Sequence, residues 1–199
     1  MPRDVSKFVH VNATDTCSVW NVLSSLTLYR ASKGGKIVFC CTGYVHYECI
    51  RRPRKSFNLL EQELQKRLQK ALTENQFSAY PLELRDLQNA ALMKKRKNLG
   101  LGELATLAFA MKAGIAFLTD DRGAQKFAVE CISAEKVQTT PHLLGWLFFE
   151  SILTDGDKSK IISEHSAMGR PLASPFEEMY IEALRCRLLT QRTITKPVE

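Results

Sequence analysis

The sequence predicts an α/β fold in which a mainly parallel sheet lies between two layers of helices. Short apolar runs of strand length alternate with longer segments in which apolar residues recur every three or four positions. Strands that alternate with helices form parallel sheets with helices on both faces. Acidic residues follow two of the apolar runs closely, at the strand ends where such folds gather their ligands. We therefore expect a three-layer α/β/α sandwich with extra C-terminal helices.

The first part of the chain is predicted to contain two strands and two main helices. Leu60, Leu64, Leu68 and Leu72 recur every four residues, which indicates an amphipathic helix. Glycines at positions 34 and 35 are typical of a helix end. The predicted elements are a strand near 8–12, a helix at 18–31, a strand at 37–41, a short helix or turn at 44–50 and a helix at 59–72.

The second part continues the alternation. Tyr80-Pro81 is interpreted as a break before the next helix, and Pro141 as the start of a later one. A turn at 99–102 leads into a helix with Leu104, Leu107, Ala108 and Met111 at core spacing. The predicted elements are helices at 83–97 and from about 103, a strand at 115–119, a helix at 123–130, a short strand at 137–140, and helices at 141–152, 157–168 and 176–190.

The length and composition indicate one globular domain. The chain has 199 residues, of which 45% are hydrophobic, so a sizeable core is available. We assign the domain to residues 1–190, with a core at about 7–150 and a helical extension at about 151–190, and expect 191–199 to be a flexible tail. The formal charge of +7 favours a polyanionic substrate such as a nucleic acid.

Cysteine usage and hydropathy indicate a cytoplasmic protein. None of the six cysteines forms a C-x-x-C pair, so we expect buried free thiols in a reducing compartment. The N-terminus lacks the apolar segment of a signal peptide. The longest apolar stretch, 143–153, is too short to cross a bilayer, so no membrane partner is predicted. The apolar helix within it packs in the core or, as the weaker alternative, in a homodimer interface.

Acidic residues at four places in the chain are the candidate functional residues. Carboxylates crowded at strand ends repel one another unless a cation neutralises them, and hard oxygen ligands suit Mg²⁺ or Mn²⁺. Each residue also has a purely structural interpretation, because carboxylates cap helices, favour a helix N-terminus or simply face solvent. The order of the four places along the chain favours a shared metal site. The residues are Asp15, Glu48, Glu103, Asp120 and Asp121.

These residues lie in four motifs that resemble those of PIN-domain nucleases. The motifs are Asp15-Thr16-Cys17 after the first strand, Val45-His46-Tyr47-Glu48 after the second, Gly100-Leu101-Gly102-Glu103 at a helix start, and Thr119-Asp120-Asp121 at a strand end. The resemblance covers about residues 7–150 and extends to about 185. It departs from the family at Cys17, where PIN proteins more often carry Ser, Asn or Thr to support the first Asp by hydrogen bonding.

The resemblance implies an endoribonuclease that uses one or two divalent cations. Asp15 would be the central metal ligand, and Asp120 and Asp121 would close the site, with the choice between these two left open. Glu103 would bind metal directly or through water, and Glu48 would bind or orient a second ion or its water. Many PIN proteins of this size resemble toxins of toxin–antitoxin pairs, so an antitoxin is the implied protein partner.

Basic residues near the second motif are candidates for substrate binding. Arg51, Arg52, Arg54 and Lys55 begin three residues after Glu48 and would contact phosphates, although a solvated loop explains them equally well. Two other functions remain open. One is a non-catalytic PIN-like module that binds nucleic acid or protein, and the other is a DNA nuclease of the same architecture. The preference for RNA rests on the family resemblance alone.

Overall fold

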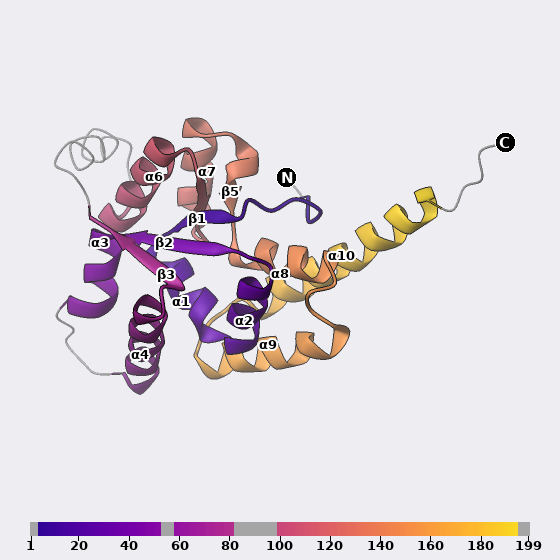
Figure 1. The fold of residues 1–199 in the computed structure, drawn as a ribbon, viewed down its shortest axis with the longest axis horizontal. Coiled ribbons are helices and arrows are strands. Elements are labelled where there is room, and N and C mark those ends of the chain that lie inside the picture. Colours follow the sequence, from indigo (N-terminus) through magenta and orange to yellow (C-terminus); the bar gives the residue numbers. More distant parts are fainter. Residues whose placement is uncertain (1–3, 53–57, 82–98, 195–199) are drawn as a thin grey trace.

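The computed structural model describes residues 4–52, 58–81 and 99–194 (Figure 1). Within these ranges the chain folds as α/β, with a five-stranded, all-parallel sheet between layers of helices. Additional helices follow the last strand. The fold class predicted from the sequence is therefore confirmed.

The sheet changes direction of winding between its first and fourth strands. The strand order is β3-β2-β1-β4-β5, so the chain builds outward from β1 on one side and then continues on the other. Ala13 in β1 lies opposite both Cys40 in β2 and Phe117 in β4. The carboxyl ends of β1 and β4 are therefore adjacent at the topological switch point, where α/β folds bind ligands. The strands are β1 (Val11–Thr14), β2 (Val38–Thr42), β3 (Phe77–Tyr80), β4 (Ala116–Leu118) and β5 (Val137–Gln138).

Four strands lie near their predicted positions, and one was missed. The strand predicted near 8–12 starts only at Val11 and continues to Thr14, which brings its end directly to Asp15. The prediction did not include β3, because Tyr80-Pro81 was interpreted only as a break. β3 pairs with β2 alone and forms one edge of the sheet. Pro81 directly follows β3 and ends it, because proline has no backbone N–H to donate to a neighbouring strand.

The helix predicted at 18–31 is wrong as a single element. It forms two helices, α1 (Thr16–Ser24) and α2 (Leu26–Gly34), because Ser25 adopts an extended backbone with φ −111° and ψ 112°. Ser25 Oγ accepts a hydrogen bond from the Leu28 amide at 3.1 Å and so caps α2. The chain turns at Ser25 without a glycine or a proline, which is why the sequence pattern did not reveal the break.

The middle helices place the acidic motifs. α3 (Gly43–His46) continues as the π-helical turn η1 (Tyr47–Arg51), which carries Glu48. The helix that begins after Gly100 has a buried face, but Met111, predicted in its core, is 43% exposed and lies on the outer side. The predicted helix at 83–97 falls outside the described residues. The other helices here are α4 (Leu59–Thr73), α6 (Leu101–Ala113), α7 (Arg122–Cys131) and the 3₁₀ turn η2 (Ala134–Lys136).

The C-terminal helices are α8 (Thr140–Phe149), α9 (Asp155–Ala167) and α10 (Ala173–Ile194). Leu143, Leu144, Leu147 and Phe148 of α8 are completely buried. The prediction that this apolar helix packs in the core is therefore confirmed, and its apolar face is not available for a dimer. α10 packs along α8, where the rings of Phe148 and Tyr180 meet edge to face with their centroids 4.9 Å apart. The last turns of α10 extend beyond the body of the protein (Figure 1).

Two apolar clusters, one on each face of the sheet, hold the layers together. Phe39 and Leu118 belong to the larger cluster, which includes α1, α2, α4 and α8. Cys40 and Phe117, one position away in the same strands, belong to the smaller cluster with α6 and α7. Side chains alternate between the two faces of a strand, so both faces of β2 and β4 are covered. This double burial is typical of parallel sheets.

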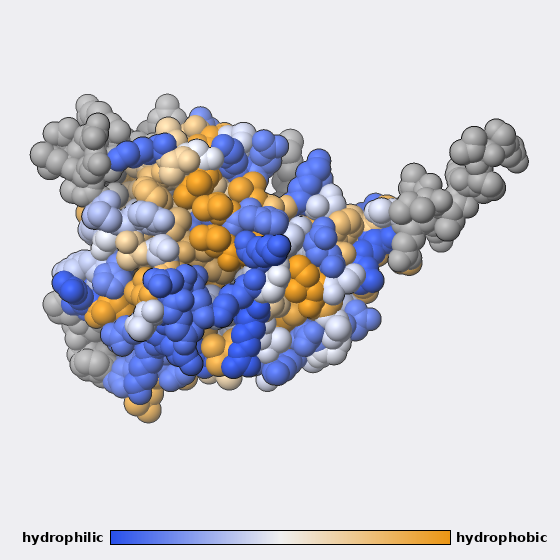
Figure 2. Space-filling view, viewed as in Figure 1, coloured by the Kyte–Doolittle hydropathy of each residue, from blue (hydrophilic) through white to orange (hydrophobic). Residues whose placement is uncertain are grey.

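The surface is mixed in polarity. Figure 2 shows hydrophilic side chains predominating over the lower part of the visible face, where α2, α4 and α9 lie. Within the described residues, no helix has both the length and the apolar character needed to span a membrane. None of the six cysteines forms a disulfide, and Cys40, Cys41 and Cys49 are buried as predicted, whereas Cys17, Cys131 and Cys186 are only partly buried.

Candidate functional site

Two of the predicted acidic residues meet at the switch point of the sheet. Asp15 follows β1 directly, and Asp120 follows β4 after one residue. Ser18, in the first turn of α1, connects them: its backbone N–H donates to Asp15 Oδ1 at 2.7 Å, and its Oγ lies 3.5 Å from Asp120 Oδ2. Residues that are distant in sequence thus place two carboxylates beside each other, in the position where such sheets bind ligands.

Asp15 is almost completely buried, with 1% of its surface exposed. Its Oδ2 accepts a hydrogen bond of 2.5 Å from Thr119 Oγ1, and its Oδ1 accepts the Ser18 amide. The pKa of Asp15 is raised to about 7, mainly by burial; the bonds from Thr119 and Ser18 oppose the rise, and the charge of Asp120 adds to it. The carboxylate is held in a fixed orientation, although its negative charge is poorly solvated.

Asp120 is held on two sides. Thr140, at the start of α8, donates its backbone N–H to Oδ1 at 2.8 Å and its hydroxyl to Oδ2 at 2.6 Å. From α1, the Asn21 amide donates Nδ2–H to Oδ2 at 2.7 Å. Hydrogen bonds to the charged form stabilise a carboxylate at this position. Asp120 thereby connects β4, α8 and α1.

A cation from the C-terminal segment reaches the same cluster. Arg170 donates from Nε to Asn21 Oδ1 at 2.7 Å, and its Nη2 lies 3.4 Å from Cys17 Sγ. Burial raises the pKa of Cys17 to about 11, helped by the charges of Asp15 and Asp120 and opposed by Arg170. Cys17 is therefore a protonated thiol at neutral pH and a poor nucleophile.

The adjacent residue Asp121 has a different place. Its Oδ1 accepts the Ala124 amide at 2.7 Å, so it is the N-cap of α7. The sequence could not choose between Asp120 and Asp121 as partner of Asp15. The structure brings Asp120 into contact with the residues around Asp15, while Asp121 caps a helix.

Glu103 lies in the first turn of α6. Its Oε2 accepts the Gly100 amide at 2.8 Å, which satisfies one of the free donors at the helix start. Burial raises the pKa of Glu103, and the charges of Asp121 and Glu48 add to this rise, whereas the Gly100 amide lowers it. Glu103 is therefore close enough to Asp121 and Glu48 for their charges to act on it.

Glu48 packs against the Gly100–Glu103 motif. A Cβ atom on Gly102 would collide with the Glu48 carboxylate, so the missing side chain is what permits their approach. Glu48 Oε2 accepts the Thr16 hydroxyl at 2.6 Å, and Oε1 forms an ion pair of 3.3 Å with Arg52. Glu48 thus lies between the first turns of α1 and α6, where a negative charge is favoured by the helix dipoles.

The residues fit a magnesium-type site only in part. Among the described residues, no three His, Cys, Asp or Glu side chains are grouped closely enough to hold one ion. The four predicted ligands are therefore not gathered as a closed set: Asp15 and Asp120 form a pair, and Glu103 and Asp121 lie in a neighbouring group with Glu48. One or two carboxylates suffice for Mg²⁺, which keeps several waters and takes further ligands from substrate phosphates. The pair of Asp15 and Asp120 fits that requirement.

The predicted substrate-binding residues are only partly described. Arg51 is exposed in η1, and Arg52 follows it and forms the ion pair with Glu48. Arg54 and Lys55 lie outside the described residues. The structure therefore relates one of these four cations directly to an acidic residue of the site.

Sequence reasoning missed the polar residues that hold the two aspartates. Asn21 is 1% exposed and lies between the buried apolar residues Trp20 and Val22, and a buried amide of this kind signals a specific partner. Thr119 precedes Asp120 and Asp121, and the sequence marked it as part of a motif without indicating its bond to Asp15. Arg170 lies far from every motif, and no local signal marks it. The missed residues are Ser18, Asn21, Thr119, Thr140 and Arg170.

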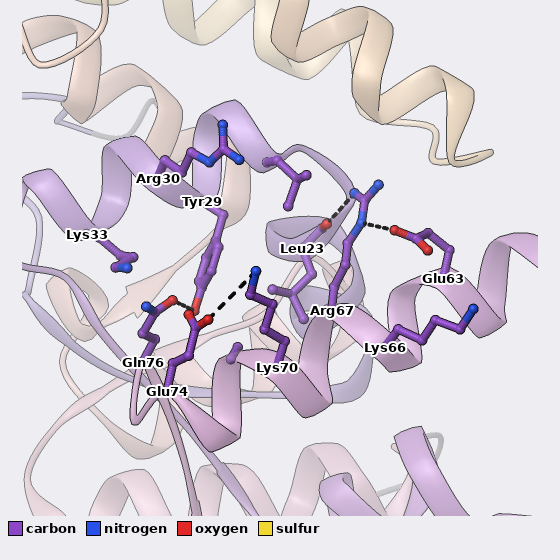
Figure 3. Close-up of a pocket in the computed structure, with 12 residues that line it drawn as sticks. Leu23, Tyr29, Arg30, Lys33, Glu63, Lys66, Arg67, Lys70, Glu74 and Gln76 are labelled. Atoms are coloured by element: carbon purple, nitrogen blue, oxygen red, sulfur yellow. Dashed lines mark hydrogen bonds and ion pairs between the residues drawn. The ribbon is translucent and has the colours of Figure 1, made fainter.

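A separate pocket of about 320 Å³ lies between α2 and α4 (Figure 3). Its wall includes Arg67, which donates from Nε to Glu63 at 2.9 Å and from Nη1 to the Leu23 carbonyl at 2.9 Å. None of the five predicted acidic residues lines this pocket. We therefore place the candidate functional site at the switch point.

Comparison with known proteins adds no family assignment. No protein-family model, curated protein or solved structure matches this chain.

Proposed function

We propose that this chain is a metal-dependent nuclease of PIN type that hydrolyses phosphodiester bonds in RNA. One observation carries the proposal: Asp15 and Asp120 lie beside each other at the ends of adjacent parallel strands, at the switch point of the sheet. Asp15 is buried and Asp120 is partly buried, and two carboxylates placed together in this way repel each other unless a cation joins them. The order of the four acidic motifs supports the family, and RNA as substrate follows from the resemblance.

The metal would be Mg²⁺ or Mn²⁺ held by Asp15 and Asp120. Glu103 and Asp121 would bind the same ion through water or contribute to a second one, and Glu48 would orient that ion or its water. When bound, such an ion polarises the phosphoryl oxygen and lowers the pKa of a water molecule, so that hydroxide forms near neutral pH.

Hydrogen bonds from the surrounding residues orient the Asp15 carboxylate before a cation binds. Thr119 and the Ser18 amide each donate to one carboxylate oxygen, so the side chain is fixed before any ligand arrives. Because its pKa is about 7, Asp15 is about half protonated at neutral pH without a cation. A neighbouring positive charge favours the ionised form, so a cation would displace that proton.

Cations attract the polyanionic substrate. The net charge of +7 opposes the negative charge of the site itself, and Arg51 and Arg52 lie beside Glu48. Phosphate contacts of this kind hold a nucleic acid in place without reading its sequence. An antitoxin partner, a homodimer and a cytoplasmic location stay predictions, and a dimer would have to use a surface other than the buried face of α8.

The decisive experiment is cleavage of labelled single-stranded RNA and of matching DNA, with Mn²⁺ or Mg²⁺ against EDTA. The parent protein is compared with Asp15→Asn and Asp120→Asn. Glu177→Gln, on the exposed side of α10, serves as a matched control for the loss of a carboxylate. We expect metal-dependent RNA cleavage in the parent and in the control. Each Asp→Asn change should reduce the rate by at least ~100-fold, and circular dichroism should show an unchanged fold.

Other results would point to the alternatives. Cleavage of DNA but not RNA would identify a DNA nuclease of the same architecture. If neither strand is cut, Mn²⁺ titration of the parent and of Asp15→Asn separates two cases. Binding that Asp15→Asn abolishes would indicate a nuclease with a selective target. Absence of binding in both would refute the metal site and favour a non-catalytic binding module.

A further inference from the structure

We propose that Arg170 is a positioning residue of the acidic site and acts through Asn21 on Asp120. This inference rests on the proposed function, because Asp120 is assigned there as a metal ligand. Arg170 lies in the C-terminal helical segment, outside the region of the four motifs. The structure nevertheless connects it to the site by two consecutive hydrogen bonds of 2.7 Å.

The direction of these bonds fixes the Asn21 amide. An arginine side chain has donors and no acceptor, so only Oδ1 of Asn21 can face Arg170 Nε. Nδ2 must then face the opposite way, where it donates to Asp120 Oδ2. A flipped amide would direct its oxygen at the carboxylate and its N–H groups at the guanidinium. Arg170 therefore selects the one amide orientation in which Asn21 donates to Asp120.

The backbone presents Arg170 at this place through a turn at the end of α9. Gly169 has a φ of 67°, a left-handed conformation that glycine adopts without strain. The Gly169 and Arg170 amides donate back to the carbonyls of Ser166 and His165, at 2.9 and 3.2 Å. These bonds end the helix and direct Arg170 toward α1.

Polar contacts anchor α9 to the junction between α1 and α2. Glu164 Oε2 accepts from Ser25 Oγ at 2.7 Å and from the Thr27 amide at 3.0 Å, and Oε1 accepts the Thr27 hydroxyl at 2.9 Å. Next to it, His165 Nδ1 lies 2.6 Å from Ser24 Oγ. The end of α9 is thus fixed relative to α1, the helix that carries Asn21. Arg170 reaches the site from a rigid support.

Arg170 also compensates for an unusual residue in the first motif. Cys17 occupies the position where the resembled family more often carries Ser, Asn or Thr, and a thiol is only a weak hydrogen-bonding group. Arg170 Nη2 contacts Cys17 Sγ at 3.4 Å and Arg170 Nε bonds to Asn21 at the same time. In this chain one part of the support for Asp120, the orientation of Asn21, therefore comes from a residue far along the sequence.

The test compares Mn²⁺ affinity in the full-length parent, Arg170→Gln, Arg170→Lys, Asn21→Ala and the Arg170→Gln/Asn21→Ala double variant. Arg30→Gln is the charge-matched control, because Arg30 lies in the pocket between α2 and α4 (Figure 3). We expect Arg170→Gln to weaken Mn²⁺ binding ~10–100-fold, the usual effect of removing a residue that orients a metal ligand. Arg170→Lys should recover part of the loss, and Arg30→Gln should bind as the parent does.

The double variant distinguishes positioning from a general structural role. If Arg170 acts through Asn21, the double variant binds Mn²⁺ no more weakly than Asn21→Ala alone, so the two effects are not additive. Additive losses would overturn the proposal, as would an Arg170→Gln protein that binds Mn²⁺ like the parent. Thermal unfolding of each variant identifies any change that simply prevents folding, and Arg170→Lys then carries the comparison.

A second readout does not depend on metal. The side-chain amide of Asn21 gives its own signals in a ¹⁵N spectrum, and we expect them to shift in Arg170→Gln and to stay near the parent positions in Arg30→Gln. Unchanged Asn21 signals in Arg170→Gln would overturn the link. If the parent binds no Mn²⁺ at all, the proposed function fails, and the amide signals still decide whether Arg170 orients Asn21.

Discussion

Thr119 donates its hydroxyl to Asp15 Oδ2 at 2.5 Å and so joins the ends of two strands that pair in the sheet. The bond connects the residue after β4 with the residue after β1. Both residues are buried, at 0% and 1% exposure, so water does not replace the bond if it is lost. Thr119 therefore supports the ionised form of the central carboxylate.

Thr119→Val should raise the pKa of Asp15 further above its present value of about 7, because one stabilising donor is lost. A bond to a charged group contributes about 1.5–3 kcal/mol, so metal affinity at pH 7 should fall by roughly one to two orders of magnitude. The acidic limb of the pH–rate profile should move to higher pH. Thr119→Ser keeps the hydroxyl and should behave as the parent. An identical profile in Thr119→Val would contradict the role of this bond.

The stability of the metal-free protein should fall as pH rises from about 4 to 7. The folded-state pKa of Asp15 lies above its unfolded value of 3.8, so the native state binds the extra proton in this window. Above pH 7 the penalty is complete, on the order of 4 kcal/mol. Asp15→Asn removes it and should unfold at a higher temperature than the parent at pH 8, with the difference vanishing near pH 4. Equal melting temperatures at pH 8 would contradict the shift.

Gly102→Ala should displace Glu48 and break its bond to Thr16, because the added Cβ collides with the carboxylate. Because the Glu48 carboxylate is the end of a flexible side chain that can move, the expected loss of stability is modest, about 0.5–1.5 kcal/mol by denaturant titration, as for one lost hydrogen bond. Gly100→Ala is the matched control, since its Cβ would meet Glu103 Oε2 at an ordinary 3.6 Å. Glu48→Ala combined with Gly102→Ala should be less destabilised than the sum of the two changes. Strict additivity would show that the collision is not the cause.

Glu164→Ala should loosen α9 from the junction at Ser25, because three hydrogen bonds to Ser25 and Thr27 are lost together. Removing such a partner leaves donors unsatisfied and costs about 1–3 kcal/mol. Hydrogen exchange should accelerate in α9. Glu177→Ala removes an exposed carboxylate of α10 and is the control, which should exchange as the parent does. Unchanged exchange in α9 of Glu164→Ala would refute the anchoring role of Glu164.

The sequence predicted where the strands that carry the acidic residues end, but it did not predict the break between α1 and α2 or strand β3. Asp15 and Asp120 were found because each follows an apolar run, and the ends of parallel strands share one edge of the sheet. The break at Ser25 was missed because no glycine or proline marks it; Ser25 caps α2 through the Leu28 amide and also donates to Glu164 of α9, a partner that the local pattern does not reveal. β3 was missed for a similar reason: four residues beside Pro81 become a strand only because β2 provides a ladder.

The sequence predicted the acidic residues of the candidate site but not the residues that hold them by hydrogen bonds. Carboxylates in motifs can be recognised from spacing, whereas Asn21 and Thr140 become part of the site only when α1 and α8 meet at Asp120. Met111 shows the opposite limit, since helical spacing placed it in the core and the packing of α6 left it outside. Arg170 had no sequence signal, because its partners lie in a helix near the other end of the chain.

The placement of Arg170 also has a consequence for the order of events during synthesis. A ribosome releases the chain from the N-terminus, so Asp15 appears long before Thr119, and Arg170 appears later still. Until β4 pairs with β1, Asp15 lacks the Thr119 hydroxyl, and until α9 docks, Asn21 has no guanidinium to orient it. A nascent chain therefore carries the acidic motifs before the bonds that hold Asp15 and Asp120 are complete, and the last of them forms only when the end of α9 has packed against α1.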